Sequence, residues 1–426
     1  MRAIKEHFNC LFKVSRREIE VKQKIMNAIP RYRPSHGLAL FAAGYRPFFL
    51  LSALWAALAV PVWLVLFTNA WASSLNLPAM VWHVHEMVFG FGAATVAGFL
   101  LTAIPNWTGR MPLQGLPLAG LVALWLAGRA ACLGAGLIGA VAAMLLDLAF
   151  PAVFLGIVAR EIIAGRNWRN LPMLAALAAL LAGNVLVHLA SLGVVDTAEL
   201  GNRLGVATLL ALISLVGGRI IPSFTRNWLI KQRPGTALPA PFGMVDRVAL
   251  GATLVTLAFF VVDPSGGVLP WVALAAGVAL ALRLRRWRGL ATWREPLLIV
   301  LHLGYGWLAF GFLLLAIDAF LPWLPRTSAL HALTVGAIGT MTLAVMTRAT
   351  LGHSGQPLTA GAGTAMIYAL ITLAALLRLS APLAGVHYPR ALDLAGTAWS
   401  AAFLLFAALY APLLMRPRIR AHAMAG

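Results

Sequence analysis

Histidines are the residues in this sequence whose type and spacing best support chemistry. The chain has ten of them, and six lie inside or at the ends of long apolar segments: His83, His85, His188, His302, His331 and His353. An imidazole can bind a transition metal or carry a proton, and an ionisable side chain inside a bilayer is costly enough to indicate function. His36 and His387 lie in or near loops, where we expect solvated surface residues.

The segment WHVHEM, residues 82–87, is the sharpest local feature. Side chains two residues apart on an α-helix differ in direction by about 200°, so His83 and His85 are predicted to point to opposite faces and to serve different cofactors. Glu86 follows His83 by three residues, which predicts that it shares the His83 face. A carboxylate at that position would orient the imidazole of a metal ligand.

Twelve apolar segments carry or surround these residues. The 426-residue chain is 61% hydrophobic and 11% charged, and a membrane span needs about 20 apolar residues. The segments lie near residues 46–68, 80–104, 114–134, 137–160, 171–193, 203–223, 245–262, 268–287, 297–321, 329–350, 362–384 and 394–415. Continuous Leu, Ala, Val and Gly runs of this length predict an all-α polytopic membrane bundle and exclude a β-barrel.

The positive charge is distributed as a topology signal. The net charge is +20, but Lys and Arg concentrate in the first 37 residues, in alternate loops and after the last span. By the positive-inside rule this pattern predicts that both termini lie in the cytoplasm, and it argues against nucleic-acid binding. We expect a basic tail at residues 1–37, a membrane domain at 38–416 and a short tail at 417–426, with Met26 an alternative start to Met1.

This topology sorts the six histidines by depth. His83, His85, His188 and His331 fall in one outer layer, whereas His302 and His353 lie towards the cytoplasm. Such a layer can bind metals, relay protons or form hydrogen bonds that fix helix packing. Three arginines near the inner face are candidates for binding a haem propionate or a lipid phosphate, or are simple topology anchors: Arg219, Arg226 and Arg348.

A weak internal repeat accompanies the spans. The cytoplasmic ends of spans 2, 6 and 10 read LTAIPNWTGRMPL, RIIPSFTRNWLIK and MTRATLGHSGQPL, each mixing Thr, Gly or Pro with Arg. Their spacing of four helices predicts three four-helix units, although basic, turn-forming helix ends also resemble one another by chance. The twelve spans and the intramembrane histidines also resemble the architecture of haem-copper oxidases. An analogy of architecture alone says little about function.

Several long stretches resemble the NnrS family. They include YRPFFLLSALWA (45–56), WHVHEMVFGFGAATVAGFLLTAIPNWTGR (82–110), NWRNLP (167–172), GGRIIPSFTRNWL (217–229), REPLLIVLHLGYGWL (294–308) and HALTVGAIGTMTLAVMTRATLGHSG (331–355). The resemblance implies a bacterial inner-membrane protein that contains haem and copper and takes part in nitric oxide metabolism and protection against nitrosative stress. The histidines of its motifs fall on the six named above.

Which histidine binds which metal stays open at this stage. We interpret the outer pairs as holders of a haem, b-type because no C-x-x-C-H is present, with His85, His188, His302 and His331 as candidates. Copper would bind at the remaining histidines, beside Glu86. An open axial position on the iron would bind nitric oxide or a nitrosyl species, arriving through lipid past Gly90, Gly92, Gly98, Gly336 and Gly339. The rival interpretation is a transporter of copper, haem or a nitrosyl species with the same histidines as its transit site; no enzymatic reaction is assigned.

Overall fold

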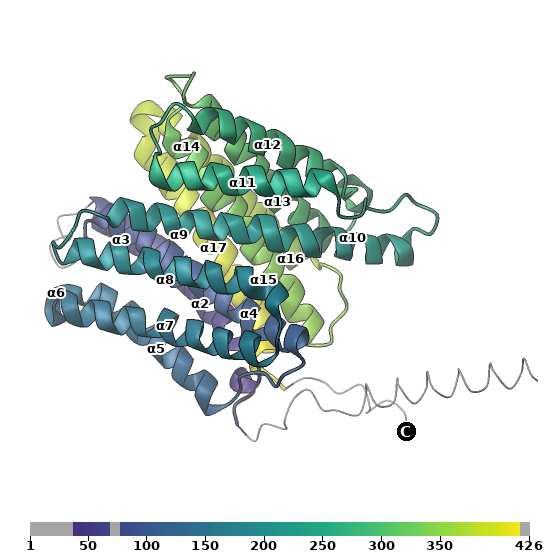
Figure 1. Ribbon diagram of the computed structural model, residues 1–426, viewed down its shortest axis with the longest axis horizontal. Helices are drawn as coiled ribbons and strands as arrows, with labels where there is room; N and C mark the ends of the chain where they lie inside the picture. The colour runs from purple at the N-terminus through teal and green to yellow at the C-terminus, as the bar shows by residue number, and fades with distance from the viewer. Residues whose placement is uncertain (1–36, 69–76, 418–426) are drawn as a thin grey trace, which may run out of the picture.

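The computed structural model describes residues 37–68 and 77–417, and within them every regular element is a helix. Eleven helices are long and apolar enough to cross a membrane. The 17-residue α12 (Leu269–Arg285) occupies the place of the eighth predicted span. The chain is therefore an integral membrane protein whose long helices lie side by side (Figure 1). Met1 and Met26, the two predicted starts, and most of both predicted tails lie outside the described residues.

The helices form three consecutive units of the same order. The first comprises α2 (Tyr45–Thr68), α3 to α4 (Ala79–Thr108), α5 (Leu116–Leu133) and α7 (Ala140–Ala164), with the short α6 (Ala135–Ile138) before α7. The second comprises α8 (Leu171–Ser191), α9 to α10 (Ala198–Gln232), α11 (Met244–Val262) and α12. The third comprises α13 (Pro296–Ile317), α14 to α15 (Arg326–His353), α16 (Ala362–Ser380) and α17 (Tyr388–Met415). This element order confirms the predicted division into three four-helix units.

The second long helix of each unit contains a π-helical segment. These segments are η3 (Glu86–Gly92), η5 (Ile213–Gly217) and η7 (Ala332–Gly339). A π-helical stretch is rare and often marks a functional site, because it widens the helix and redirects the side chains around it. The same irregularity thus occurs once in every unit, and in units 1 and 3 it lies on the helix that carries His83 and His85 or His331.

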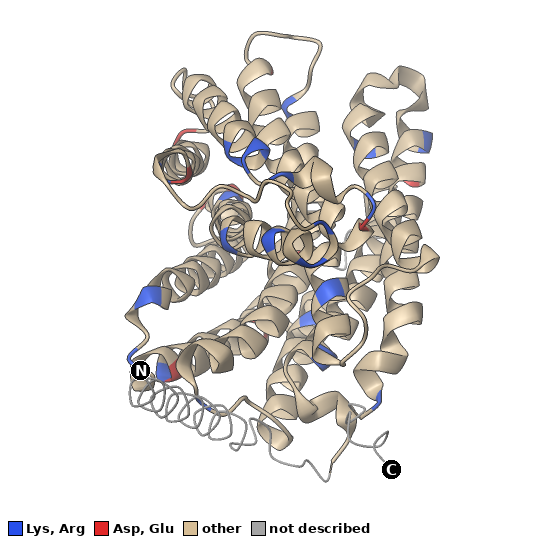
Figure 2. Cartoon of the chain, turned by 90° about the vertical axis from the view of Figure 1, so that its right-hand side faces the viewer, with Lys and Arg blue, Asp and Glu red and all other residues tan. Residues whose placement is uncertain are grey.

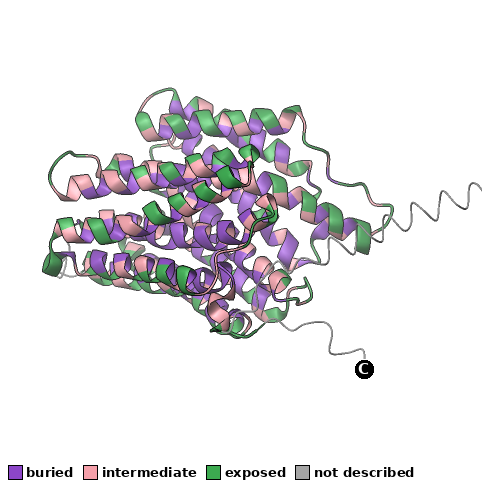
Figure 3. Cartoon of the chain, turned by 60° about the horizontal axis from the view of Figure 1, so that its bottom comes forward, coloured by how far each residue is buried: buried purple, intermediate pink, exposed green. Residues whose placement is uncertain are grey.

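The three units close into a ring around these second helices. Unit 1 packs against unit 2 through α7 and α8, unit 2 against unit 3 through α12 and α13, and unit 3 returns to unit 1 through α17 and α2. Inside the ring, η3 and η7 both contact α9. The most apolar stretches of the second helices are 72, 61 and 72% buried, against 28% in α7. Buried residues therefore gather inside the bundle and exposed ones on its outer helix faces (Figure 3), where many of the exposed residues are large and apolar.

Lys and Arg gather at one end of the bundle. Figure 2, viewed from the right-hand side of Figure 1, shows many basic residues and few acidic ones on the helix ends and loops that face the viewer. These are the ends that the sequence predicts to be cytoplasmic. The histidines of the predicted outer layer lie towards the opposite ends of their helices, near the starts of the long helices Ala79–Thr108 and Arg326–His353 or the end of α8.

Candidate metal centre

A cluster of polar side chains is buried where the first unit meets α8. It joins His85 at the end of α3, Glu86 at the start of η3, Arg129 on α5, Asp147 on α7, and Asn184 and His188 on α8. Each of these residues is at most 3% exposed. We call this set the buried cluster. Charged groups placed this deeply need partners, because the surrounding apolar medium solvates them poorly.

Arg129 is the counter-charge of the cluster. Its guanidinium forms ion pairs with the carboxylates of both Glu86 and Asp147. The indole of Trp55 on α2 donates a further hydrogen bond of 2.9 Å to Glu86 Oε2. Two carboxylates and one guanidinium leave one negative charge without a counter-charge when all are ionised. The two imidazoles must therefore meet it with a proton, or a bound cation must supply it.

The hydrogen bonds of His85 locate that missing positive charge. Its Nδ1 lies 3.0 Å from Glu86 Oε1, and its Nε2 lies 2.8 Å from Asn184 Oδ1 and 3.2 Å from Asp147 Oδ2. All three oxygens are acceptors, but a neutral imidazole has only one N–H to donate. One ring nitrogen of His85 therefore requires an added proton or a metal ion.

Asp147 Oδ2 is the point at which the cluster converges. Asn184 Nδ2 donates to it over 2.8 Å, and His188 Nε2 lies 2.9 Å away. The rings of His85 and His188 are 5.3 Å apart between centroids and nearly perpendicular. Two imidazoles and one carboxylate oxygen thus face the same small volume from α3, α7 and α8.

Cys132 completes a set of metal-ligand atoms. The described residues contain one group of three or more His, Cys, Asp or Glu whose ligand atoms all lie within 4.8 Å of one another: His85, Cys132, Asp147 and His188. Cys132 is a buried free thiol on α5, one turn beyond Arg129. Imidazole nitrogens combined with a thiolate are the ligands that copper and zinc prefer. The cluster is therefore a possible metal-binding group by both composition and spacing.

Two glycines make room for the cluster. A Cβ at Gly90 in η3 would lie 2.8 Å from Glu86 Oε2 and from Trp55 Nε1, and one at Gly128 would lie 2.9 Å from Asp147 Oδ1. The Gly90 carbonyl also accepts a 3.1 Å hydrogen bond from the indole of Trp125. Larger side chains at either glycine would displace the carboxylates, so the backbone has to approach them closely here.

The predicted direction of Glu86 is wrong. Its carboxylate binds His85 and Arg129 rather than lying beside His83. The α-helical spacing used for that prediction ends at His85, because the π-helical segment begins at Glu86. His83 instead stacks on Trp63 of α2, with ring centroids 4.2 Å apart. His83 and His85 do lie in different environments, as their spacing predicted: His83 beside Trp63 and His85 in the buried cluster.

The outer layer of four histidines separates into two pairs. His85 and His188 belong to the buried cluster, whereas His83 interacts electrostatically with His331 and with Arg378 of α16. Arg129, Asp147, Cys132 and Asn184 were not predicted as site residues. The first two stood in the sequence as charged residues inside apolar spans, and that signal alone would have identified them.

The remaining predicted residues lie apart from the buried cluster. His302 Nδ1 lies 3.0 Å from the Leu298 carbonyl oxygen and its Nε2 3.3 Å from Thr225 Oγ1, so both ring nitrogens have partners. His353 packs against Tyr45. Among the arginines, Arg219 and Arg226 are exposed, and the Arg348 guanidinium lies 4.2 Å from the centroid of the Phe224 ring.

A second buried ion pair lies in unit 2. Arg283 of α12 donates to Asp246 Oδ1 over 2.9 Å and to the Tyr305 hydroxyl over 2.9 Å, and it also donates to the Ser214 carbonyl in η5 over 3.0 Å. Asp246 Oδ2 also lies 3.6 Å from Arg286 Nη1, and the described residues place no histidine or cysteine in this network. We interpret it as a tie between α11, α12, α13 and the π-helical segment η5.

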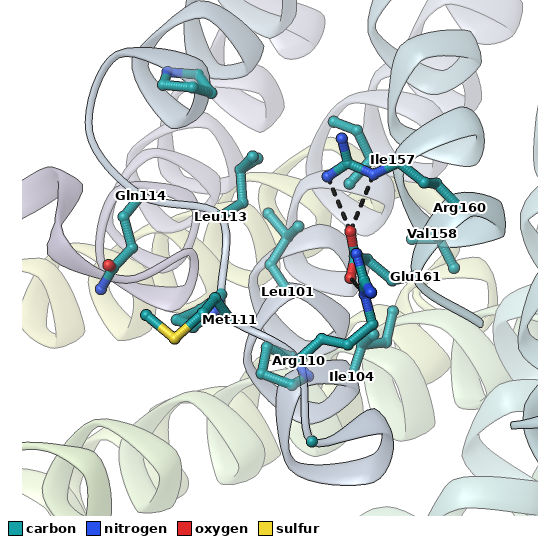
Figure 4. A pocket seen from close by; sticks show the side chains of 14 residues that line it. Leu101, Ile104, Arg110, Met111, Leu113, Gln114, Ile157, Val158, Arg160 and Glu161 are labelled. Carbon is teal, nitrogen blue, oxygen red and sulfur yellow. Dashed lines mark hydrogen bonds and ion pairs between the residues drawn. The ribbon is translucent and has the colours of Figure 1, made fainter. Parts of the chain in front are cut away.

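Two cavities border the second helix of unit 1. The larger, of about 630 Å³, lies at the end of α4 distant from the buried cluster. Its charged residues Arg110 and Arg160 both bind Glu161 (Figure 4). The smaller, of about 100 Å³, is almost wholly apolar and lies between the second helices of the three units, lined by residues such as Phe99, Leu209 and Met341.

The glycines expected to admit a gas are mostly packed. Gly98 lies against Phe49, Gly336 against Trp307 and Gly339 against Trp399, each leaving less than 3 Å for a Cβ. Gly92 also contacts Leu209 closely, but it is the one of the five expected glycines that lines the apolar cavity. The space for an uncharged molecule is therefore between the helices rather than at the glycines.

Comparison with known proteins gives one family. The family model described as NnrS protein matches residues 39–418, which cover all three units. A search of the curated proteins found no match.

Proposed function

We propose, from the premise that this chain belongs to the NnrS family, that it is a haem- and copper-binding protein of the bacterial inner membrane. Its role would be in nitric oxide metabolism and in protection against nitrosative stress. Family membership supports this role, and the buried cluster supports metal binding. Both termini are proposed to lie in the cytoplasm, on the side where the basic residues gather.

The environment of the His85 imidazole is the main evidence for a metal ion in the buried cluster. Its two ring nitrogens face three oxygen acceptors, and the cluster lacks one positive charge. A cupric ion bound by His85, His188 and the Cys132 thiolate would supply that charge, because the thiolate cancels only one of its two positive charges. Two imidazoles and one thiolate are the ligands of many protein copper sites, and the Asp147 carboxylate would be a fourth oxygen nearby.

Copper would supply one-electron chemistry at this place. The protein residues would do the rest: Arg129 holds the two carboxylates ionised and oriented, and Trp55 donates to the same Glu86 oxygen, Oε2, as Arg129 does. Asn184 holds Asp147 at a fixed distance from both imidazoles. Because every residue of the buried cluster is at most 3% exposed, water is excluded from it.

The partner of this site is proposed to be nitric oxide or a nitrosyl species. An uncharged diatomic gas dissolves in lipid and needs no aqueous path. The apolar cavity between Gly92, Leu209 and Met341 gives it a place inside the bundle, and the exposed apolar faces of the helices contact lipid. We expect nitric oxide to change the spectrum of the reduced, metal-loaded protein.

Metal analysis of the purified full-length protein tests the proposal. We expect about one copper per chain and bound haem in the native protein. His188→Ala and Cys132→Ser should each lower copper by tenfold or more with haem retained. His387→Ala, at an exposed position, is the matched control and should change neither.

Two outcomes would overturn the assignment. Native protein without copper under reducing and oxidising conditions alike would reduce the buried cluster to a structural ion-pair network. Protein without haem that carries copper, haem or nitrosyl species into proteoliposomes would support transport, the rival interpretation. Cells lacking the protein should grow worse under nitrosative stress and normally without it.

A further inference from the structure

His83 and His331 occupy corresponding places in two of the three units. Each lies within the first two turns of the second long helix, just before the π-helical segments η3 and η7. The two imidazoles are close enough to interact electrostatically. They therefore lie near one another, one in the first unit and one in the third, apart from the buried cluster.

Both imidazoles keep a nitrogen free for a ligand. His83 Nδ1 is buried and has no hydrogen-bond partner. His331 Nδ1 lies 2.6 Å from the Thr327 carbonyl oxygen, which can only accept, so the proton is on Nδ1 and the lone pair is on Nε2. Two neutral imidazoles with available lone pairs are a pair of metal ligands rather than a hydrogen-bonded pair.

The buried guanidinium of Arg378 near His83 and His331 distinguishes this pair from a binding site for a bare metal cation. The described residues include four arginines less than 10% exposed: Arg46, Arg129, Arg283 and Arg378. Arg129 and Arg283 face carboxylates, and Arg46 donates to backbone carbonyls of Ala39, Leu414 and Arg416. Arg378 forms no ion pair within the described part of the chain, and its Nη1 has no partner.

Arg378 in unit 3 corresponds in position to Arg129 in unit 1. Arg129 on α5 and Arg378 on α16 both lie near the end of the third helix of their unit and approach the second helix. Unit 1 supplies Glu86 and Asp147 as anions, whereas Arg378 interacts with the hydroxyl of Tyr388 and both imidazoles. A buried guanidinium without an anion is costly, so this position calls for an anionic group from a ligand.

One class of ligand meets both requirements. A simple metal cation would be repelled by Arg378, and a simple anion would leave the two lone pairs unused. A metalloporphyrin has two axial positions for imidazoles and carries carboxylates that a guanidinium binds well. The indole of Trp63, already stacked on His83 with its N–H unpartnered, offers an aromatic face beside it.

We propose that His83 and His331 are the axial ligands of one haem and that Arg378 binds one of its carboxylates. This inference rests on the proposed function, of which it names the haem-binding residues. Two imidazoles on one iron leave no open position for a gas. This haem would then serve electron transfer, and nitric oxide would react elsewhere in the protein.

Spectroscopy of the purified full-length protein tests the inference. The native protein should show the near-infrared magnetic circular dichroism and electron paramagnetic resonance signals of a low-spin ferric haem with two imidazole ligands. His83→Gly and His331→Gly should each abolish them, with a loss of bound haem of tenfold or more, and added imidazole should restore the signals. A merely structural role for either histidine would not give rescue by imidazole.

The arginine has its own readout. A positive charge next to the haem stabilises the reduced form relative to the oxidised form. Arg378→Gln removes that charge and should therefore lower the haem reduction potential, whereas Arg378→Lys keeps the charge and should retain most of the native value. His302→Ala and His353→Ala are matched controls within the membrane and should change neither signal nor potential. Unaltered elution in gel filtration shows that a variant is folded.

The outcomes separate this inference from the proposed function. Native protein that binds haem, with unchanged signals in both His83→Gly and His331→Gly, would overturn the ligand assignment and leave the proposed function standing. Native protein that binds copper without haem would overturn the inference and the haem part of the proposed function together. A five-coordinate, high-spin haem would exclude the pairing of the two histidines.

Discussion

Replacing Arg129 with Met tests whether charge holds the buried cluster together. Arg129 is the counter-charge of Glu86 and Asp147, whose side chains are 0 and 1% exposed. Removing one partner of a buried ion pair costs about 3–5 kcal/mol because the other charge is left unpaired. The single substitution leaves two carboxylates unpaired, so we expect a loss of at least about 3 kcal/mol in the free energy of unfolding at pH 7.

The measurement is reversible unfolding in mixed detergent micelles. The penalty should shrink as the pH falls, because protonation removes the unpaired charges. It should also shrink in the background Glu86→Gln with Asp147→Asn, since both carboxylates are then neutral amides. Arg110→Met is the matched control: Arg110 pairs with Glu161 but its side chain is 42% exposed, and such surface pairs contribute about 0–1 kcal/mol.

The two backgrounds decide between explanations. If Arg129→Met cost as much without the carboxylates as with them, the loss would come from packing of the long side chain. The proposed charge count of the cluster, and with it the need for a proton or metal at His85, would then be refuted.

Three further predictions follow from the contacts described. Gly90→Ala should destabilise the protein by about 1–3 kcal/mol and lower bound copper, since its Cβ would lie 2.8 Å from Glu86 Oε2; Gly120→Ala, with no atom within 4 Å of its Cβ, should change neither quantity. Asp246→Asn should cost about 3–5 kcal/mol in unfolding free energy because it leaves Arg283 buried without its carboxylate, whereas Glu199→Gln on the surface should have no measurable effect. Reporter fusions at Asp196 and Asp263 should mark the outside and those at Arg166, Lys231 and Arg288 the cytoplasm, and two reversed sites would refute the topology.

The fold could be predicted because a membrane span leaves a plain signal in one dimension. Each predicted apolar segment coincides with a helix of the structure, for example 245–262 with α11 (Met244–Val262) and 297–321 with α13 (Pro296–Ile317). The three-unit division also follows from the sequence, because helix ends of similar composition recur after every four spans. The π-helical segments could not be predicted, since glycine-containing apolar runs like theirs also form ordinary α-helix in this chain, for example in α13 with Gly304, Gly306 and Gly311.

The site could be predicted only in part. The depth of His85 and His188 follows from their distance to the helix ends, and the structure brings them together. Their pairing in the cluster, and that of His83 with His331, depends on how α3, α8 and α14 are rotated about their axes and packed in the ring. The rotation of each helix cannot be derived from one sequence. The usual route is to extrapolate the α-helical periodicity, and that periodicity is broken where the π-helical segment begins at Glu86.

The two histidine pairs also differ in the sign of the charge that their surroundings lack, and comparison of the repeated units shows this difference. Repeated units begin with equivalent positions, so a departure from equivalence marks a place where one unit has been altered. Unit 1 pairs its buried arginine with two carboxylates of its own and leaves a deficit of one positive charge at His85. Unit 3 has Arg378 in the corresponding helix without a carboxylate, which leaves a deficit of negative charge beside His83 and His331. A cation satisfies the first and an anionic metal complex satisfies the second, so two cofactors of opposite charge can bind in one histidine layer without competing for the same site.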